Sequence, residues 1–218
     1  MTPADRYLAA AQSLVDLDLP ATAAALCPTG IRGVAPDDVP AALARLSTCE
    51  MAAAAAIRIA WGLPDPEPYV AGSAGPRLEK IVNAVPWAPP LALDPSRPSA
   101  LRYPTLDAPP TRGEGLWFAG APGHPEHVDA CVVDDQVYSA AKTGGDPVVT
   151  TTSGPLLVYS AVAGGQPPAP GQPGSCYVRL VARTLRWDGS AWVDEGTGRK
   201  VMAAIVPARL AEMYGGEG

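Results

Sequence analysis

The chain has 218 residues, which is enough for one domain with a substantial hydrophobic core. Its 47% hydrophobic and 17% charged residues exclude disorder of the chain as a whole, although 22 glycines and 26 prolines predict many turns and at least one long ordered loop. A formal net charge of −6 provides no positive field for phosphate groups, so nucleic acid and anionic membranes are poor partners.

The first 84 residues carry helical patterns. Residues 2–15 offer a threonine cap, a proline at the first helical position and apolar residues at helical spacing. A short helix is expected within 37–46, and the strongest helix signal of the chain covers Cys49–Trp61, ending before a glycine. A further helix is expected from about 70 to 84.

Residues 85–112 contain eight prolines and no apolar periodicity, which predicts a long loop or a polyproline-like strap rather than a helix or strand. Short β-rich segments separated by turns follow. The predicted strands are Leu116–Ala119, His127–Val133, Gln136–Ala140, Val148–Thr152, Leu156–Val162, Cys176–Trp187, Trp192–Asp194 and Lys200–Val206. Asp188-Gly189 predicts a hairpin, with Trp187 and Trp192 as a cross-strand core pair.

Helices followed by strands indicate an α+β fold, with N-terminal helices, an antiparallel sheet and a short final helix at 208–213. We expect a single domain with four parts. These are a helical N-terminal cap (1–35), a second helical region (36–84), the proline-rich strap (85–112) and the sheet with its final helix (113–218).

No membrane span and no secretory signal are predicted. The sequence has no apolar run of about 18 residues, and residues 1–6 lack the basic-then-apolar order of a signal peptide. We therefore expect a cytoplasmic protein or one exported by a dedicated machine. The four cysteines form no C-x-x-C pair, so we expect free thiols rather than a disulfide scaffold or a zinc finger.

The chain has two histidines, His124 and His127, so imidazole chemistry is confined to one segment. Alternate residues of a strand share a face, which predicts His127, Asp129 and Cys131 on one face of the strand expected at His127–Val133. A strand start with surface histidines is the alternative. A metal site at His124, Glu126 and His127 is less favoured, because zinc needs three or four ligands of suitable geometry.

Cys49 stands at the predicted start of an alanine-rich helix. The unpaired N–H groups and the dipole at such a position favour an anion, and a thiol there becomes nucleophilic near neutral pH. The alternative is a small buried hydrophobic residue, a common state of free thiols. Cys27, Cys131 and Cys176 fit this alternative better, because they lie in a turn or within predicted strands.

Residues 47–62 resemble the nucleophile helix of NlpC-type and CHAP-type cysteine peptidases and amidases, in which a cysteine heads a helix that ends at a glycine. Residues 115–118 are similar to the first strand of that family, and 126–132 to its His-Val-Gly strand. Residues 164–166 resemble the turn after the next strand, and 199–210 the last strand and terminal helix. The resemblance implies a papain-like fold with the nucleophile helix packed on the sheet.

The resemblance further implies a thiol-dependent hydrolase in which Cys49 attacks an amide carbonyl and His127 acts as base and then acid. In the family a third polar residue orients the histidine; Gln166 is a tentative match, and Ser139, Asp129 and Asp146 are rivals. The substrate is expected to be a peptide or a peptidoglycan-type amide, with no cofactor and no metal. The oligomeric state is not specified.

A second interpretation follows from the absence of a clear third residue. If Leu156–Val162 is the strand that carries this residue in the family, the acid expected just before Gly164 is replaced by Ala163. The chain is therefore, alternatively, a catalytically impaired member of the same fold that acts as a peptide- or protein-binding module.

Overall fold

The structure is a computed structural model, and it describes most of the chain. The described residues are 1–15, 17–43, 49–65, 68–69, 100–135, 138–143, 146–151, 155–161 and 178–215, with the backbone alone for 138–143 and 146–151. These residues form helices and antiparallel strands, which confirms the α+β class expected from the sequence.

Most of the described helices precede the strands, as the sequence predicts. The helices are α1 (Pro3–Gln12), α2 (Leu19–Leu26), the 3-10 helix η1 (Pro36–Asp38), α3 (Val39–Leu43), α4 (Cys49–Trp61) and α6 (Pro207–Tyr214). The bounds predicted for α4 are confirmed at both ends. The helix expected at 70–84 lies outside the described residues. None of the described helices combines the length and the apolar character needed to cross a bilayer.

The described strands form two antiparallel sheets rather than the one sheet expected. The six-stranded sheet has the order β1-β10-β2-β3-β6-β7, and the four-stranded sheet has the order β4-β5-β8-β9. The strands are β1 (Leu101–Arg102), β2 (Gly115–Phe118), β3 (His127–Val132), β4 (Tyr138–Thr143), β5 (Asp146–Thr151), β6 (Leu156–Ala161), β7 (Val178–Arg183), β8 (Leu185–Trp187), β9 (Trp192–Asp194) and β10 (Val201–Ile205).

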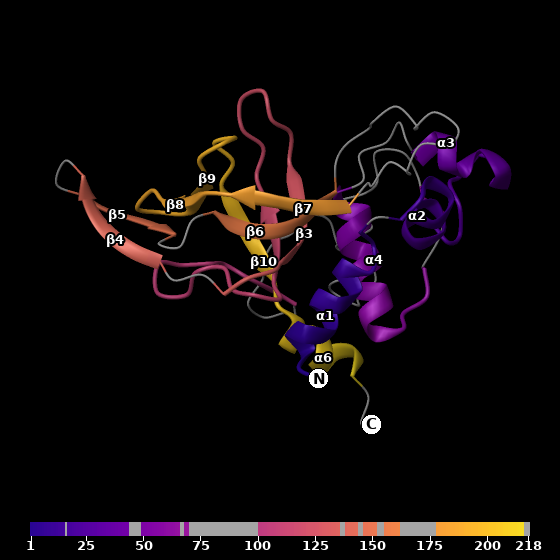
Figure 1. Cartoon of the computed structure of the whole chain (residues 1–218), viewed down its shortest axis with the longest axis horizontal. Coiled ribbons are helices and arrows are strands. Elements are labelled where there is room, and N and C mark those ends of the chain that lie inside the picture. The colour runs from indigo at the N-terminus through magenta and orange to yellow at the C-terminus, as the bar shows by residue number, and fades with distance from the viewer. Residues whose placement is uncertain are drawn as a thin grey trace.

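The six-stranded sheet separates two cores. On one face α1 and α4 pack against it, and the sheet contributes Trp117, Val128 and Tyr159 to this helix-side core. On the other face, Phe118 and other sheet residues pack with Trp192 of the four-stranded sheet. Figure 1 shows this division, with α1, α2 and α4 at one end of the molecule and β4, β5 and β8 at the other.

Helix α4 owes its central place to its small side chains. A run of alanines at 52–56 favours the helical backbone and lets the helix approach the sheet closely. Each of these alanines is at most 3% exposed, and α4 packs on β3 and β6 as well as on α1. The helix ends at Gly62, whose positive φ of 65° allows the amide of Leu63 to hydrogen-bond back to the carbonyl of Arg58 at 2.9 Å.

Two strand predictions need correction. Residues 100–112 were expected to contain no strand, but Leu101–Arg102 forms β1, because the edge of β10 offers backbone partners at Ile205 and Ala204. The single strand predicted for Cys176–Trp187 is two strands in its described part. Arg183 ends β7 in the six-stranded sheet, and Leu185 begins β8 in the four-stranded sheet, so the chain crosses between sheets there.

The predicted hairpin after β8 is confirmed. Trp187 pairs with Trp192, and their rings meet edge to face with centroids 5.7 Å apart. The turn between them is held by Asp188, whose Oδ1 accepts hydrogen bonds from the amides of Ser190 and Ala191, each at 2.8 Å. Trp187 and Trp192 therefore form a cross-strand packing pair, as predicted.

The alternation of side chains along β3 is broken by a bulge. Asp129 pairs with Ser160, whereas the next pairs on β6 are Cys131 with Tyr159 and Val132 with Val158. The register shift leaves Ala130 as an extra residue, so Cys131 lies in the helix-side core and Val132 in the opposite core. The prediction that Cys131 shares a face with His127 and Asp129 is therefore wrong.

Candidate functional site

Cys49 begins α4, as predicted, and it is buried. The residue is 5% exposed and belongs to the helix-side core. Its Sγ donates a hydrogen bond to Oε2 of Glu50 at 3.1 Å. Both observations are typical of a small buried residue, the alternative expected for this cysteine.

His127 begins β3, and its ring is held by a buried polar network. Its Nε2 lies 2.9 Å from Oδ1 of Asp129, 2.9 Å from Oγ of Ser160 and 3.0 Å from Nη2 of Arg183. A guanidinium can only donate and a carboxylate can only accept, so in either tautomer Nε2 hydrogen-bonds with one of Arg183 and Asp129 and not with both. All of these contacts are made by one ring nitrogen.

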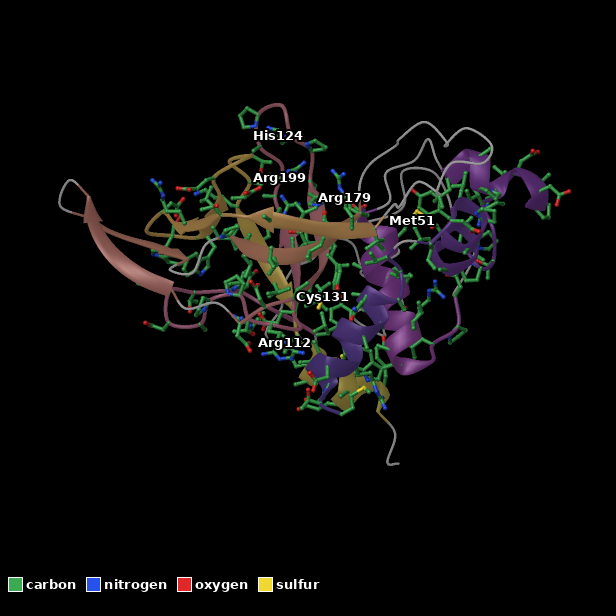
Figure 2. The ribbon with its side chains drawn as sticks, viewed as in Figure 1. Met51, Arg112, His124, Cys131, Arg179 and Arg199 are labelled. Carbon is green, nitrogen blue, oxygen red and sulfur yellow. The ribbon has the colours of Figure 1, made fainter. Side chains whose placement is uncertain are left out.

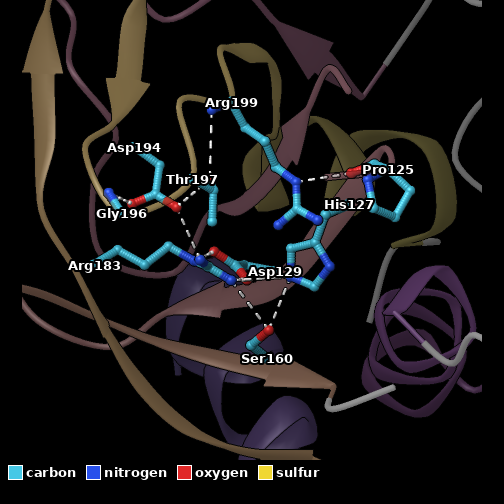
Figure 3. A network of polar contacts seen from close by, with 9 residues as sticks. All are labelled: Pro125, His127, Asp129, Ser160, Arg183, Asp194, Gly196, Thr197 and Arg199. Atoms are coloured by element: carbon cyan, nitrogen blue, oxygen red, sulfur yellow. Dashed lines mark hydrogen bonds and ion pairs between the residues drawn. The ribbon is translucent and has the colours of Figure 1, made fainter. Parts of the chain in front are cut away.

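Arg183 is the centre of this network, as Figure 3 shows. Its Nε and Nη2 contact the two oxygens of Asp129, the latter at 2.7 Å, and its Nη1 donates to Oδ2 of Asp194 at 3.1 Å. The guanidinium carbon also lies 5.3 Å from the centroid of Phe118. Since these partners come from β2, β3 and β9, Arg183 ties the two sheets together.

The charges of the network compensate one another. Burial by itself raises the pKa of the fully buried Asp129 carboxyl, but its hydrogen bond with His127 and the charge and hydrogen bonds of Arg183 outweigh that effect and lower the pKa below its ordinary value. Burial likewise lowers the pKa of Arg183, and the charges and hydrogen bonds of Asp129 and Asp194 raise it overall. Asp129 is therefore a carboxylate and Arg183 a guanidinium cation.

The structure does not bring Cys49 and His127 into contact. Val128 and Ala130 of β3 face α4, so His127 and Asp129, which alternate with them, project from the other face of the sheet. Consistent with this, the His127 ring lies beside Phe118 of the opposite core, with centroids 6.3 Å apart. No hydrogen bond joins the two side chains, both of which are described.

Among the residues proposed to orient His127, Asp129 has a described side chain, and it lies against the ring. Ser139 and Asp146 lie on β4 and β5, which belong to the four-stranded sheet, and their side chains are outside the described part of the structure. Gln166 also lies outside the described residues.

Ser160 and Arg183 were missed by sequence reasoning. Ser160 opposes Asp129 across β3 and β6, and Arg183 ends β7, far along the chain from both. A serine and an arginine within apolar strand segments give no local signal of a shared site. Knowledge of the strand pairing was needed to see that they converge.

His124 is separate from this network. It lies at the tip of the hairpin between β2 and β3, away from the body of the molecule (Figure 2), and its backbone pairs with that of Ala121. The described residues contain no group of three or more histidine, cysteine or acidic side chains that could hold a metal ion. Glu126 accepts a hydrogen bond from the indole of Trp117 instead.

A second candidate site is a pocket of about 710 Å³ beside α2. Its walls come from α2, the loop after it, the start of α3 and Pro68. The lining is mainly apolar: Ala23, Cys27, Ile31 and Val39 are buried residues. A concave apolar pocket with a few polar groups is the usual form of a binding site.

Comparison with known proteins adds no relative to these observations: no family model, curated protein or solved structure matches the chain.

Proposed function

We propose that this protein is a peptide- or protein-binding module with a papain-like arrangement in which the cysteine and histidine do not act as a catalytic pair. The observation that carries this proposal is the position of His127, whose Nε2 is engaged by Asp129, Ser160 and Arg183 on the sheet face turned away from α4. A base on that face cannot take the proton of Cys49 without leaving a buried ion network.

Cys49 itself supports the same proposal. Its hydrogen bond to Glu50 and its burial favour a structural role at the start of α4. The pocket beside α2 is the binding site that we propose for the module, because its apolar walls lie open at the surface formed by Pro20, Ala24 and Pro36.

Thiol-dependent hydrolysis of an amide, as in peptidoglycan, is the second candidate function. One observation favours it. The described contacts of the His127 ring are made by Nε2, where Asp129 could orient the ring, so Nδ1 has no hydrogen bond among them and is the nitrogen left to act as a base. This function requires that Nδ1 reach Cys49, so the imidazole must turn to the face that α4 covers.

Thiol reactivity separates the two candidates. We would measure the rate of iodoacetamide labelling at each cysteine against pH, with site assignment by mass spectrometry, in the wild type and in His127→Gln. A binding module predicts that Cys49 labels no faster than Cys27 and Cys131 below pH 7 and that the variant changes nothing. Fast labelling of Cys49 that is lost in His127→Gln would establish the hydrolase instead.

Binding is tested directly by panning a displayed peptide library against the protein. Ala24 is an exposed lining residue of the pocket on α2, and Ala21 is exposed on the same helix but is not a lining residue. Enriched peptides should bind wild type and Ala21→Trp and should lose binding to Ala24→Trp, whose indole fills the pocket. Absence of any enriched peptide, or equal binding to both variants, would refute the proposed site.

A further inference from the structure

The pocket beside α2 has an apolar lining with a single charged residue. Most of its walls are proline rings, small side chains and aliphatic side chains, and the charged residue among them is Arg32. Such walls accept an aliphatic or aromatic side chain with a gain from burial of apolar surface. They offer little to a polar or strongly charged segment, so the occupant must be largely apolar where it enters.

Arg32 adds an anion-binding group to this apolar pocket. Its side chain is exposed and makes no hydrogen bond or ion pair with any described residue, although its backbone amide donates to the carbonyl of Tyr69 at 2.8 Å. The neighbouring Gly33, another lining residue, is also exposed, and its amide has no backbone partner among the described residues. A guanidinium and a free amide next to each other in the chain suit a carboxylate.

Asp65 hydrogen-bonds to the loop that holds Arg32, but it does not pair with that arginine. Oδ2 of Asp65 accepts hydrogen bonds from the hydroxyl of Thr29 at 2.6 Å and from its amide at 3.3 Å. Asp65 forms no ion pair with Arg32. Within the described part of the chain, the positive charge of Arg32 therefore has no ion-pair partner at the pocket.

We infer that the pocket takes the C-terminal residue of a peptide or protein partner, with its hydrophobic side chain against the apolar walls and its free carboxylate on Arg32. A C-terminal hydrophobic residue carries an apolar group and an anion a few bonds apart, which matches the placement of these two features in one pocket. This inference rests on the proposed binding function and specifies the chemistry of the partner.

Pairs of peptides that differ only in the terminal group test this inference. The probes are hexapeptides labelled with fluorescein at the N-terminus and ending in Leu, Val or Phe, each prepared as the free acid and as the amide. Fluorescence anisotropy then gives the Kd of each peptide for the full chain. We expect the acids to bind about three- to tenfold more tightly than the amides, the range of a partly exposed charged hydrogen bond.

Two variants and two matched controls test which residues of the pocket cause the binding and the difference between acid and amide. Arg32→Gln should remove the difference between acid and amide, whereas Arg6→Gln, at another exposed arginine with no ion pair among the residues that the structure describes, should leave it unchanged. Ala24→Trp should weaken both forms at least tenfold, and Ala21→Trp should weaken neither.

The outcomes distinguish this inference from the proposed function. Equal binding of acid and amide to the wild type, with loss of both in Ala24→Trp, overturns the carboxylate site but leaves a peptide-binding pocket. Failure of every peptide to bind the wild type, or equal binding to Ala24→Trp and Ala21→Trp, overturns both.

Discussion

Removal of the Arg183 guanidinium should destabilise the fold strongly. The Asp129 side chain is fully buried and that of Arg183 is 10% exposed, so solvent screening between them is weak. In Arg183→Met the aliphatic volume is kept, but Asp129 loses its charge partner and two hydrogen bonds. Breaking one side of a buried ion pair costs about 3–5 kcal/mol. In a chain of this size that corresponds to a Tm lower by roughly 10 °C.

A double-mutant cycle measures how much of that cost belongs to the pair. Asp129→Asn removes the other charge, and the double variant should cost less than the sum of the two single variants by about 1–3 kcal/mol. The matched control is Arg179→Met, at an exposed arginine of the same strand, β7, which takes part in no ion pair among the described residues. Its unfolding free energy should be unchanged.

Urea denaturation followed by tryptophan fluorescence suits this cycle, because Trp192 is fully buried in the core beside the network. The interpretation of the network as the tie between the two sheets is refuted if Arg183→Met costs less than about 1 kcal/mol, or if the two single effects simply add.

Two further predictions concern stability. The pKa of Asp129 in the fold lies below its ordinary value of 3.8, so its contribution to the free energy of unfolding is complete above that value and is lost as the pH falls through the lower folded pKa. The free energy of unfolding of Asp129→Asn should therefore fall less steeply with decreasing pH than that of the wild type. Identical acid denaturation curves for the two proteins would contradict this. Glu114 accepts two hydrogen bonds from the guanidinium of Arg102, at 2.7 and 2.6 Å. Glu114→Gln weakens this contact and should lower the free energy of unfolding by about 2–3 kcal/mol. An unchanged midpoint of urea denaturation would contradict this prediction.

The structure also clarifies which parts of the candidate site the sequence could predict. The position of Cys49 at a helix start follows from local composition, because alanine-rich segments favour helix and glycine ends it. The contact between His127 and Asp129 follows from strand periodicity, since residues two apart share a face. Both statements concern neighbours in the chain.

Contacts between distant segments were beyond such reasoning. Which face of β3 meets α4 depends on how the sheet and helix pack, and the bulge at Ala130 changes the face of every residue after it. For the same reason Cys131 could not be placed correctly, and Ser160 and Arg183 could not be foreseen as partners of His127.

By itself the sequence determined the α+β class, the bounds of α4 and the hairpin of Trp187 and Trp192, because each depends on local propensity, periodicity or turn chemistry. The tertiary structure alone decided the division into two sheets, the separation of Cys49 from His127 and the pocket beside α2. The physical reason is that these features arise from long-range packing and strand register, which bring together side chains that no local pattern relates.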